Sequence, residues 1–534
     1  MKNRKLILSI LIQIFLISVI IITNSTDISN FSSILKKNYQ NSTIYTKAHI
    51  LIGPNDGVAI CSLSPSDQEV PQICNDGTGG AIITWVDGRN GAVNEDIYAQ
   101  KITSSGAVQW TANGTAICTA INVQKDPHLC SDGAGGAIIV WGDYRNSNYD
   151  IYSQKINSSG GVEWTTNGVG ICTILGTQWY PQICSDGTDG AIIMWHDYRS
   201  GSNYDIYAQK INSSGGVEWT TNGVAICTDS GSLSNAQICS DGVGGAIIAW
   251  EDDRNSNWYI YAQRINSIGG VEWTPNGVEI CTEDDSQYFA QICSDDAGGA
   301  IITWQDYRDL NYFGIYAQKV NSSGSMEWTA NGTAICTKDG DQEYPQLCSD
   351  GAGGAIITWQ DYRDSNYDVY AQNVNSSGSM EWTANGTAIC TTGDEQENPQ
   401  LCSDGAGGAI ITWKDLRSDP NGDIYAQKIS SSGNMKWLAN GVAICTVSNG
   451  QTVPQLCSDS AGGSFITWQD ERNFNYDIFA QRITESEHRP PDLIPLLILI
   501  SEQAVLFDPL LISLLLIGIG AAIVVVIIIL KFKK

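Results

Sequence analysis

Apolar residues along this chain gather in short runs and not at helical spacing. One run, Ala355-Ile356-Ile357-Thr358-Trp359, has apolar side chains at consecutive positions, and therefore on both faces of an extended strand. Such a strand is expected where both faces of a sheet are covered, because a sheet with one face in water alternates apolar and polar residues. Polar, glycine-rich stretches separate the runs. We therefore predict an all-β fold for this part of the chain.

The same pattern returns eight times. One tryptophan marks each repeat, and successive tryptophans lie 54 to 56 residues apart; they are Trp85, Trp141, Trp195, Trp250, Trp304, Trp359, Trp413 and Trp468. The repeat around Trp359 predicts four strands, at about residues 345–349, 355–361, 368–374 and 380–390, with a glycine-rich turn at 350–354. Eight units of four antiparallel strands predict an eight-bladed β-propeller, and an open β-solenoid is the structural alternative.

The two ends of the repeat array favour a closed ring. The eighth repeat stops after its third strand, at Ile483 and Thr484, and a lone fourth strand at residues 56–61 precedes the first repeat. Together these segments complete one blade, which closes a ring and has no use in a solenoid. We therefore predict a propeller over residues 53–485, closed by an N-terminal strand.

The flanks of the repeats predict export and a membrane anchor. Residues 1–23 carry Lys2, Arg4 and Lys5 before an apolar run, as in a signal peptide or an uncleaved signal anchor, and a Ser/Asn-rich linker follows over 24–52. After a second linker at 486–509, residues 510–530 contain no charge and are long enough for a transmembrane helix. The basic tail, 531–534, is expected in the cytoplasm. This predicts a single-pass cell-membrane protein with an extracellular propeller.

The charge of the chain narrows its partners. The formal net charge is −28, and such a surface repels nucleic acid. Sequons such as Asn157 and Asn212 are compatible with a glycoprotein. We find no P-loop, H-E-x-x-H motif or nucleophile elbow. The four histidines, His49, His128, His196 and His488, do not cluster in sequence. We therefore predict neither a metal site nor a cofactor.

Sixteen cysteines form eight pairs along the chain, with 12 residues between the members of the first pair and 11 in the others. An even number of cysteines in an exported protein indicates disulfides. The cysteines of each pair are assigned to an outer and to the next inner strand, a separation that is difficult to bridge, so buried free thiols are the alternative. The disulfide candidates are Cys61, Cys74, Cys118, Cys130, Cys172, Cys184, Cys227, Cys239, Cys281, Cys293, Cys336, Cys348, Cys390, Cys402, Cys445 and Cys457.

The repeat pattern P-x-[IL]-x-x-D-G-x-G-G-A-[IV]-x-x-W-x-D-x-R, followed by D-I-Y-A-Q, resembles the propeller repeats of secreted and surface proteins of bacteria and archaea. These are similar to sialidase-like (BNR-type) propellers, and the resemblance covers residues 53–485. Sialidase-type repeats carry an Asp box, S-x-D-x-G-x-x-W. Here Ser104-Ser105-Gly106 precedes Trp110 without the aspartate, so the Asp boxes are degenerate. The resemblance implies the propeller fold and not a sialidase activity.

Charged residues repeat as regularly as the tryptophans. Every repeat has Asp two residues and Arg four residues after its tryptophan, as in Asp87 and Arg89, and six repeats have a further Asp before the third strand, such as Asp96. An Arg–Asp clasp across the turn, serving stability, is the main interpretation. A charge-binding ring on one face of the propeller is the alternative.

A function needs a place where the repeats differ. Repeats four and five replace the turn aspartate by Tyr259 and Gly314, and aromatic residues surround these positions. The six candidate ligand-binding residues, expected on one face, are Trp258, Tyr259, Tyr288, Phe289, Tyr312 and Phe313. Drift in a duplicated loop is the alternative explanation.

These observations predict a membrane-anchored extracellular propeller for surface binding or adhesion, with a glycan or protein ligand and no catalytic residues. The alternatives are an exported glycan-acting hydrolase and a structural component of the cell envelope. An aromatic cluster beside convergent carboxylates would favour the hydrolase, because glycoside hydrolysis needs a pair of them.

Overall fold

The structure, a computed structural model, describes residues 48–486 except 92 and 310. The predicted leader at 1–23, the linker as far as residue 47, and the predicted linker, span and tail from residue 487 onward lie outside the described residues. Among the residues that are described, none forms a helix long and apolar enough to cross a membrane. The repeats form one unit, His49–Glu485.

The strands occur in four sets, which we give from the centre of the ring outward. The innermost strands are β3 Gln68–Asn75, β7 Gln124–Ser131, β11 Gln178–Ser185, β15 Leu233–Ser240, β19 Gln287–Ser294, β23 Gln342–Ser349, β27 Gln396–Ser403 and β31 Gln451–Ser458. The second strands are β4 Ala81–Asp87, β8 Ala137–Asp143, β12 Ala191–Asp197, β16 Ala246–Asp252, β20 Ala300–Asp306, β24 Ala355–Asp361, β28 Ala409–Asp415 and β32 Ser464–Asp470.

The third strands are β5 Asp96–Ile102, β9 Asp150–Ile156, β13 Asp205–Ile211, β17 Tyr259–Ile265, β21 Gly314–Val320, β25 Asp368–Val374, β29 Asp423–Ile429 and β33 Asp477–Ser486. The outermost strands are β6 Thr115–Cys118, β10 Val169–Cys172, β14 Val224–Cys227, β18 Val278–Cys281, β22 Thr333–Cys336, β26 Thr387–Cys390, β30 Val442–Cys445 and β2 Val58–Cys61, preceded by β1 Ala48–Ile52.

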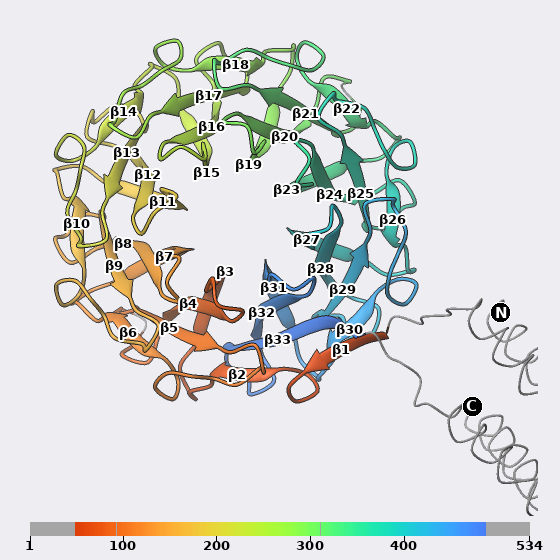
Figure 1. The fold of residues 1–534 in the computed structure, drawn as a ribbon, viewed down its shortest axis with the longest axis horizontal. Coiled ribbons are helices and arrows are strands. Elements are labelled where there is room, and N and C mark those ends of the chain that lie inside the picture. Colours follow the sequence, from red (N-terminus) through yellow and green to blue (C-terminus); the bar gives the residue numbers. More distant parts are fainter. Residues whose placement is uncertain (1–47, 92, 310, 487–534) are drawn as a thin grey trace, which may run out of the picture. The chain divides into compact units, whose positions relative to one another are not determined.

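Seven blades are antiparallel sheets of four consecutive strands, the eighth combines β31, β32 and β33 with β2 and β1, and the eight sheets follow one another round a central axis (Figure 1). The eight-bladed, all-β architecture predicted from the repeats is therefore confirmed. The fourth strand is shorter than expected: β26 begins at Thr387, and Met380 makes only an isolated bridge to Val374. The second strand of each blade is buried along nearly its whole length, as its continuous apolar run indicated.

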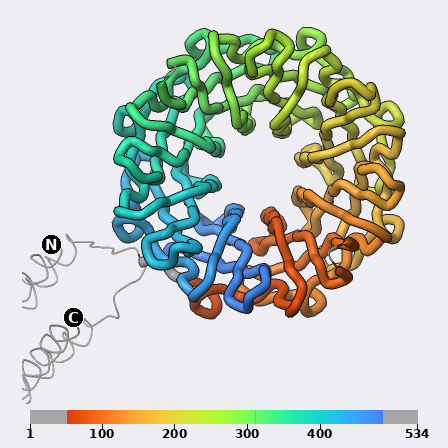
Figure 2. The backbone as a smooth tube through the Cα atoms, turned by 180° about the vertical axis from the view of Figure 1, so that it is seen from behind, coloured from red at the N-terminus to blue at the C-terminus, as the bar shows by residue number. Residues whose placement is uncertain are grey.

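Blade eight is completed by the N-terminal end of the described chain. Strand β2 pairs with β33 in antiparallel register, with Val58 opposite Ala480, so the predicted closure of the ring is confirmed. Figure 2 shows the first and last strands side by side. Strand β1 also joins β33, and residues 48–52 of the expected linker are therefore part of the propeller.

Side chains at the closure repeat those inside the other blades. Gly57 lies beneath the Trp468 ring as Gly114 lies beneath Trp85, and a Cβ atom at either glycine would come within 2.6 Å of the indole. The amide of Gln481 donates to the Ile52 carbonyl at 2.9 Å. Residues 48–61 therefore supply the contacts that the other blades take from their own repeat.

The repeated tryptophan is the centre of a polar network in every blade. In blade six Trp359 is fully buried and its Nε1 donates to Asp361 Oδ2 at 2.7 Å. Arg363 donates to both oxygens of Asp361, to the Asn385 carbonyl, and stacks 3.8 Å from the Tyr370 ring centre. Buried charge is stabilised in this way by an opposite charge and by hydrogen bonds.

Candidate functional site

A β-bulge in each innermost strand turns one side chain out of the sheet. The third residue of the strand has positive φ in all eight blades although none of the eight is glycine; they are Val70, Asp126, Tyr180, Asn235, Phe289, Tyr344, Asn398 and Val453. Bulges re-aim side chains, and bulky residues rarely adopt this backbone conformation. Tyr180 is 59% exposed as a result. The bulges therefore present a ring of variable side chains near the centre of the propeller.

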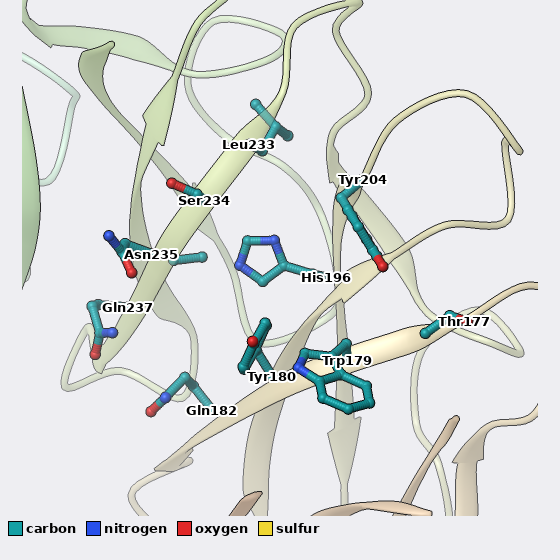
Figure 3. A pocket seen from close by; sticks show the side chains of 11 residues that line it. Thr177, Trp179, Tyr180, Gln182, His196, Tyr204, Leu233, Ser234, Asn235 and Gln237 are labelled. Carbon is teal, nitrogen blue, oxygen red and sulfur yellow. The ribbon is translucent and has the colours of Figure 1, made fainter. Parts of the chain in front are cut away.

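One cavity of about 630 Å³ opens between blades three and four on this part of the ring. Strands β11 and β15 form two of its walls, and Tyr204 comes from the turn between β12 and β13. Figure 3 shows His196, at the end of β12, between these walls. The lining residues are Thr177, Trp179, Tyr180, Gln182, His196, Tyr204, Leu233, Ser234, Asn235, Ala236 and Gln237. None of them is an aspartate or a glutamate.

Aromatic rings continue from this cavity across blades two and three. Trp179 stands edge-on to Tyr149 at 4.0 Å and to Tyr180 at 5.3 Å between ring centres. His196 lies 6.2 Å from Tyr180 and 6.4 Å from Tyr204. The last three distances are typical of packed aromatic pairs, and the Tyr149–Trp179 pair is closer still. The rings form a continuous row in which Tyr180 and Tyr204 are exposed.

His196 contributes a neutral ring to the cavity. Its side chain is only 5% exposed, and burial lowers the pKa of His196 to about 4, while a hydrogen bond with the backbone of Leu233 acts in the opposite direction. The imidazole is therefore uncharged at neutral pH. The cavity presents neutral aromatic, amide and hydroxyl groups to a ligand.

The cavity lies where a repeated contact between blades is replaced. At four junctions the side chain after the repeated tryptophan accepts the N–H of the bulged residue in the next blade. The bonds are Gln469 to Val70 at 3.1 Å, Glu251 to Phe289 at 2.5 Å, Gln305 to Tyr344 at 3.1 Å and Gln360 to Asn398 at 3.2 Å. In blade three this position holds His196, which bonds to Leu233 instead.

Two further changes in sequence accompany the cavity. The innermost strand begins with a buried glutamine in seven blades. In blade four it begins with Leu233, which gives the cavity an apolar surface. Trp179 occupies a position where the other repeats have small, polar or charged side chains or Tyr288. Sequence reasoning missed Trp179 because its position differs from repeat to repeat, and it missed Leu233 although the other seven repeats have glutamine there. A tryptophan outside the repeated pattern was the available signal.

The six aromatic residues predicted from repeats four and five lie in separate places in the structure. Tyr288 and Phe313 meet at 6.2 Å between ring centres, and Tyr307 joins Phe313 at 4.9 Å. Phe289 instead packs on Tyr344 of the next blade at 4.7 Å. A smaller cavity of about 310 Å³ includes Tyr312 and Phe313 with Asp309, Lys338 and Asp339.

The other two predicted residues, Trp258 and Tyr259, lie just before strand β17 and at its first position. Tyr259 is 8% exposed and belongs to the core between blades three and four. The carbonyl of Trp258, just before it, accepts the Gln287 N–H at 2.8 Å. The six residues therefore do not form one continuous surface, and the larger aromatic cavity lies one blade junction earlier.

The repeated arginines pair within their own motif. In blade one Arg89 binds Asp87, two residues earlier, with Nη2 to Oδ2 at 2.6 Å. Asp96, the turn aspartate, accepts instead from Asn90 at 2.6 Å, and burial raises the pKa of Asp96 to about 6. A clasp between arginine and the turn aspartate was one way to satisfy these charges, and the structure uses the nearer carboxylate.

The predicted disulfides are not formed, because all sixteen cysteines are free thiols. Cys118 ends the outermost strand of one blade, while Cys130 lies in the innermost strand of the next. The Cys118 thiol contacts Arg145 Nη2 at 3.2 Å. Burial raises the pKa of both thiols to about 12. The structure therefore has the buried thiols of the alternative interpretation, and the expected difficulty of bridging two distant strands is its reason.

Among the described residues, no group of three or more histidine, cysteine, aspartate or glutamate side chains is placed to hold a metal ion. His128 and Gln182 approach each other at 3.3 Å across blades two and three, and burial lowers the pKa of His128 to about 4. Two of the four histidines, His49 and His488, have no described side chain.

No protein-family model and no curated protein matches this sequence. Solved structures resemble its fold at low identity. A protein of unknown function from Dyadobacter fermentans is 9% identical with a TM-score of 0.38, over 82% of this chain and all of that one. The propeller domain of the Trilobed protease from Pyrococcus furiosus is 8% identical with a TM-score of 0.41, over 71% and 98%. A Hadza microbial sialidase is 10% identical with a TM-score of 0.34, over 62% and 73%.

Proposed function

We propose that this protein is a cell-surface binding propeller that holds a neutral glycan in the cavity between blades three and four. The observation that carries the proposal is the composition of that cavity. Aromatic rings from Trp179, Tyr180 and Tyr204 lie beside the amides of Gln182 and Asn235. Ligand cavities commonly combine an apolar surface with a few polar groups that fix orientation.

The chemistry of a sugar ring matches this wall. A pyranose offers an apolar face of C–H groups, which packs on an aromatic ring, and hydroxyl groups at its rim, which exchange hydrogen bonds with amides. The row of rings from Tyr149 to His196 offers more than one aromatic surface to a sugar chain. The neutral His196 adds no charge, so a neutral glycan is favoured over an anionic one.

Binding is favoured over hydrolysis by the carboxylates. Glycoside hydrolysis uses two of them about 5 to 10 Å apart across the scissile bond. One carboxylate, Glu251, contacts this wall, and its oxygens accept from Ser234 at 2.8 Å, from Asn235 at 2.7 Å and from the Phe289 N–H at 2.5 Å. Glu251 thus holds the wall in place. The proposal is that the protein binds without cleaving.

The test uses substitutions that the repeats already contain. Trp179→Thr installs the residue of blade eight, and Tyr180→Asn installs that of blade four, so both variants should fold. We expect each to weaken binding of an oligosaccharide, chosen from a glycan array with the unaltered protein, by roughly fivefold, because one aromatic contact is worth about 1 kcal/mol. Calorimetry measures the loss.

Tyr288→Ala is the matched control, since Tyr288 has the place of Trp179 in blade five. Unchanged binding by Trp179→Thr and Tyr180→Asn would refute the proposed site. A loss confined to Tyr288→Ala would move the site to blade five. Release of reducing ends from the bound oligosaccharide would show the hydrolase instead.

The cellular part of the proposal rests on sequence alone. A leader at residues 1–23 and a span at 510–530 would hold the propeller outside the cell. Proteolysis of intact cells should then remove the propeller, and the protein should stay with membranes during carbonate extraction. Protection from protease in intact cells would contradict this topology.

A further inference from the structure

A repeated ion pair lies on the face of the ring formed by the D-G-x-G-G turns. In seven blades a basic side chain near the end of the third strand binds the aspartate that begins the turn between the first and second strands of the same blade. The pairs are Lys101–Asp76 at 2.8 Å, Lys155–Asp132 at 3.6 Å, Lys210–Asp186 at 3.2 Å, Arg264–Asp241 at 2.9 Å, Lys319–Asp295 at 3.4 Å, Lys428–Asp404 at 3.4 Å and Arg482–Asp459 at 2.7 Å. Blade six has Asn373 and Asp350 at these positions.

Each lysine ammonium group lies in a cation site formed by oxygen atoms. In blade five, Lys319 Nζ lies 3.4 Å from Asp295 Oδ2, 3.6 Å from Glu327 Oε2, and donates to the Gly353 carbonyl of the next blade at 3.1 Å. Lys101 and Lys428 bind the corresponding glycine carbonyls at 2.7 and 2.8 Å. The cation site is therefore formed by oxygen atoms of two neighbouring blades.

Blade six retains the acidic residues of this cation site, but it lacks the lysine or arginine. Asn373 pairs with Ile356 in the register by which Lys101 pairs with Ile82, so its side chain starts from the lysine position. Asp350 uses Oδ1 for the N–H groups of Ala352 and Gly354. Within the described part of the chain, no side chain or backbone group pairs with Asp350 Oδ2.

Asn373 is an independent sign of a missing partner. Its side chain is 6% exposed, and its Oδ1 is buried without a hydrogen-bond donor among the described residues. Such an oxygen costs stability unless something satisfies it. The next glycine turn lacks the ammonium as well: a serine Cβ and an aspartate carbonyl lie near the Cβ position of both Gly353 and Gly407, but only Gly353 also has a lysine Nζ there, at 3.6 Å.

We propose that a calcium ion takes the place of the missing ammonium in blade six. Its ligands are Asp350 Oδ2, Asn373 Oδ1 and the Gly407 carbonyl, with Glu381 in the place of Glu327 and water in the remaining positions. Every ligand is an oxygen and two are carboxylates, the set that Ca²⁺ takes with six to eight ligands in adaptable geometry. Few protein ligands place the affinity among the weak, extracellular class, at about 10⁻⁴ to 10⁻³ M.

The repeats again supply the test. The whole protein, treated with chelator, is titrated with CaCl₂ by calorimetry and melted with and without Ca²⁺. We expect one saturable site and a rise in melting temperature with Ca²⁺, since ligands of the folded state stabilise it. Asn373→Lys restores the residue of five other blades, so it should fold and lose both effects.

A converse variant makes the experiment decisive. Lys319→Asn recreates in blade five the arrangement of Asp295, asparagine, Glu327 and Gly353, and should bind two Ca²⁺ ions per chain. Absence of a saturable site below about 10 mM, or unchanged binding by Asn373→Lys, would overturn the proposal. The result is independent of glycan binding, because this cation site follows the end of innermost strand β23, whereas the aromatic cavity lies near the beginnings of β11 and β15.

Discussion

One buried carboxylate, Asp423, allows a quantitative test of the charge network inside blade seven. Its side chain is 1% exposed, and its Oδ2 is buried without a hydrogen-bond donor among the described residues. Burial, with the nearby carboxylates of Asp419 and Asp415, raises the pKa of Asp423 to about 6, against the partial effect of Arg417. The corresponding positions in blades four and five hold Tyr259 and Gly314, so the fold tolerates loss of this carboxylate.

The sign of the effect follows from the two pKa values. An aspartate in an unfolded chain titrates near 3.9, so the folded state binds the proton of Asp423 more tightly. The carboxylate therefore costs nothing below pH about 4, begins to destabilise the fold above it, and has its full cost above pH about 6. A difference of about 2 units corresponds to about 3 kcal/mol.

Asp423→Asn removes the charge and keeps the shape. We expect it to be about 3 kcal/mol more stable than the unaltered protein at pH 8, with the gain nearly gone at pH 4. At about 2.1 cal/mol/K per residue, a ring of roughly 440 residues unfolds with about 0.9 kcal/mol/K, so the melting temperature at pH 8 should rise by about 3 °C.

Thermal melts at the two pH values provide the assay, and Asp394→Asn, which removes an exposed carboxylate from a neighbouring loop, is the control. The informative quantity is the change in melting temperature at pH 8 minus that at pH 4. An equal change at both values, or a loss of stability at pH 8, would refute the argument that Asp423 is ionised at a cost in the folded ring.

Three further predictions follow from packing, thiols and closure. Gly386→Ala should destabilise by more than 3 kcal/mol, about three times as much as Gly351→Ala, because both have positive φ but only the first places a methyl group 2.6 Å from the Trp359 ring; denaturation of the two variants measures this. Ellman's reagent should count sixteen thiols in denaturant without reductant and almost none in the folded protein, whereas a lower count in denaturant would reveal disulfides. Deletion of residues 1–61 should lower the melting temperature by at least 10 °C, and a synthetic peptide of residues 48–61 should restore it; an unchanged melt would show that β1 and β2 are dispensable.

Most of the fold could be predicted because its determinants are local and repeated eight times. The run before Trp359 fixed the second strand, and Asp350 with its glycines fixed the turn at the correct residues. The closing strand was recognisable because residues 56–61 repeat the end of every other blade, down to Gly57 beneath Trp468. Repetition turned weak signals into firm ones.

The candidate site was harder to predict for two physical reasons. Positive φ at Tyr180 has no sequence signature, because aromatic residues avoid this conformation and adopt it here only under the constraint of the bulge. The cavity also depends on contacts between repeats, as between His196 and Leu233. Loss of the turn aspartate, the signal used from the sequence, pointed to Tyr259, which proves to be part of the core.

Closure by β1 and β2 has a mechanical consequence. Both ends of the described chain belong to blade eight, where β1 and β2 of the N-terminal end pair with β33 of the C-terminal end. A pulling force applied between the two ends therefore acts first on this pairing, and the other seven blades carry it only after the pairing has yielded. The Ile52–Gln481 bond and the Gly57–Trp468 contact resist the first step. The strength of the ring under tension is thus that of the pairing of β33 with β1 and β2, however many blades it contains.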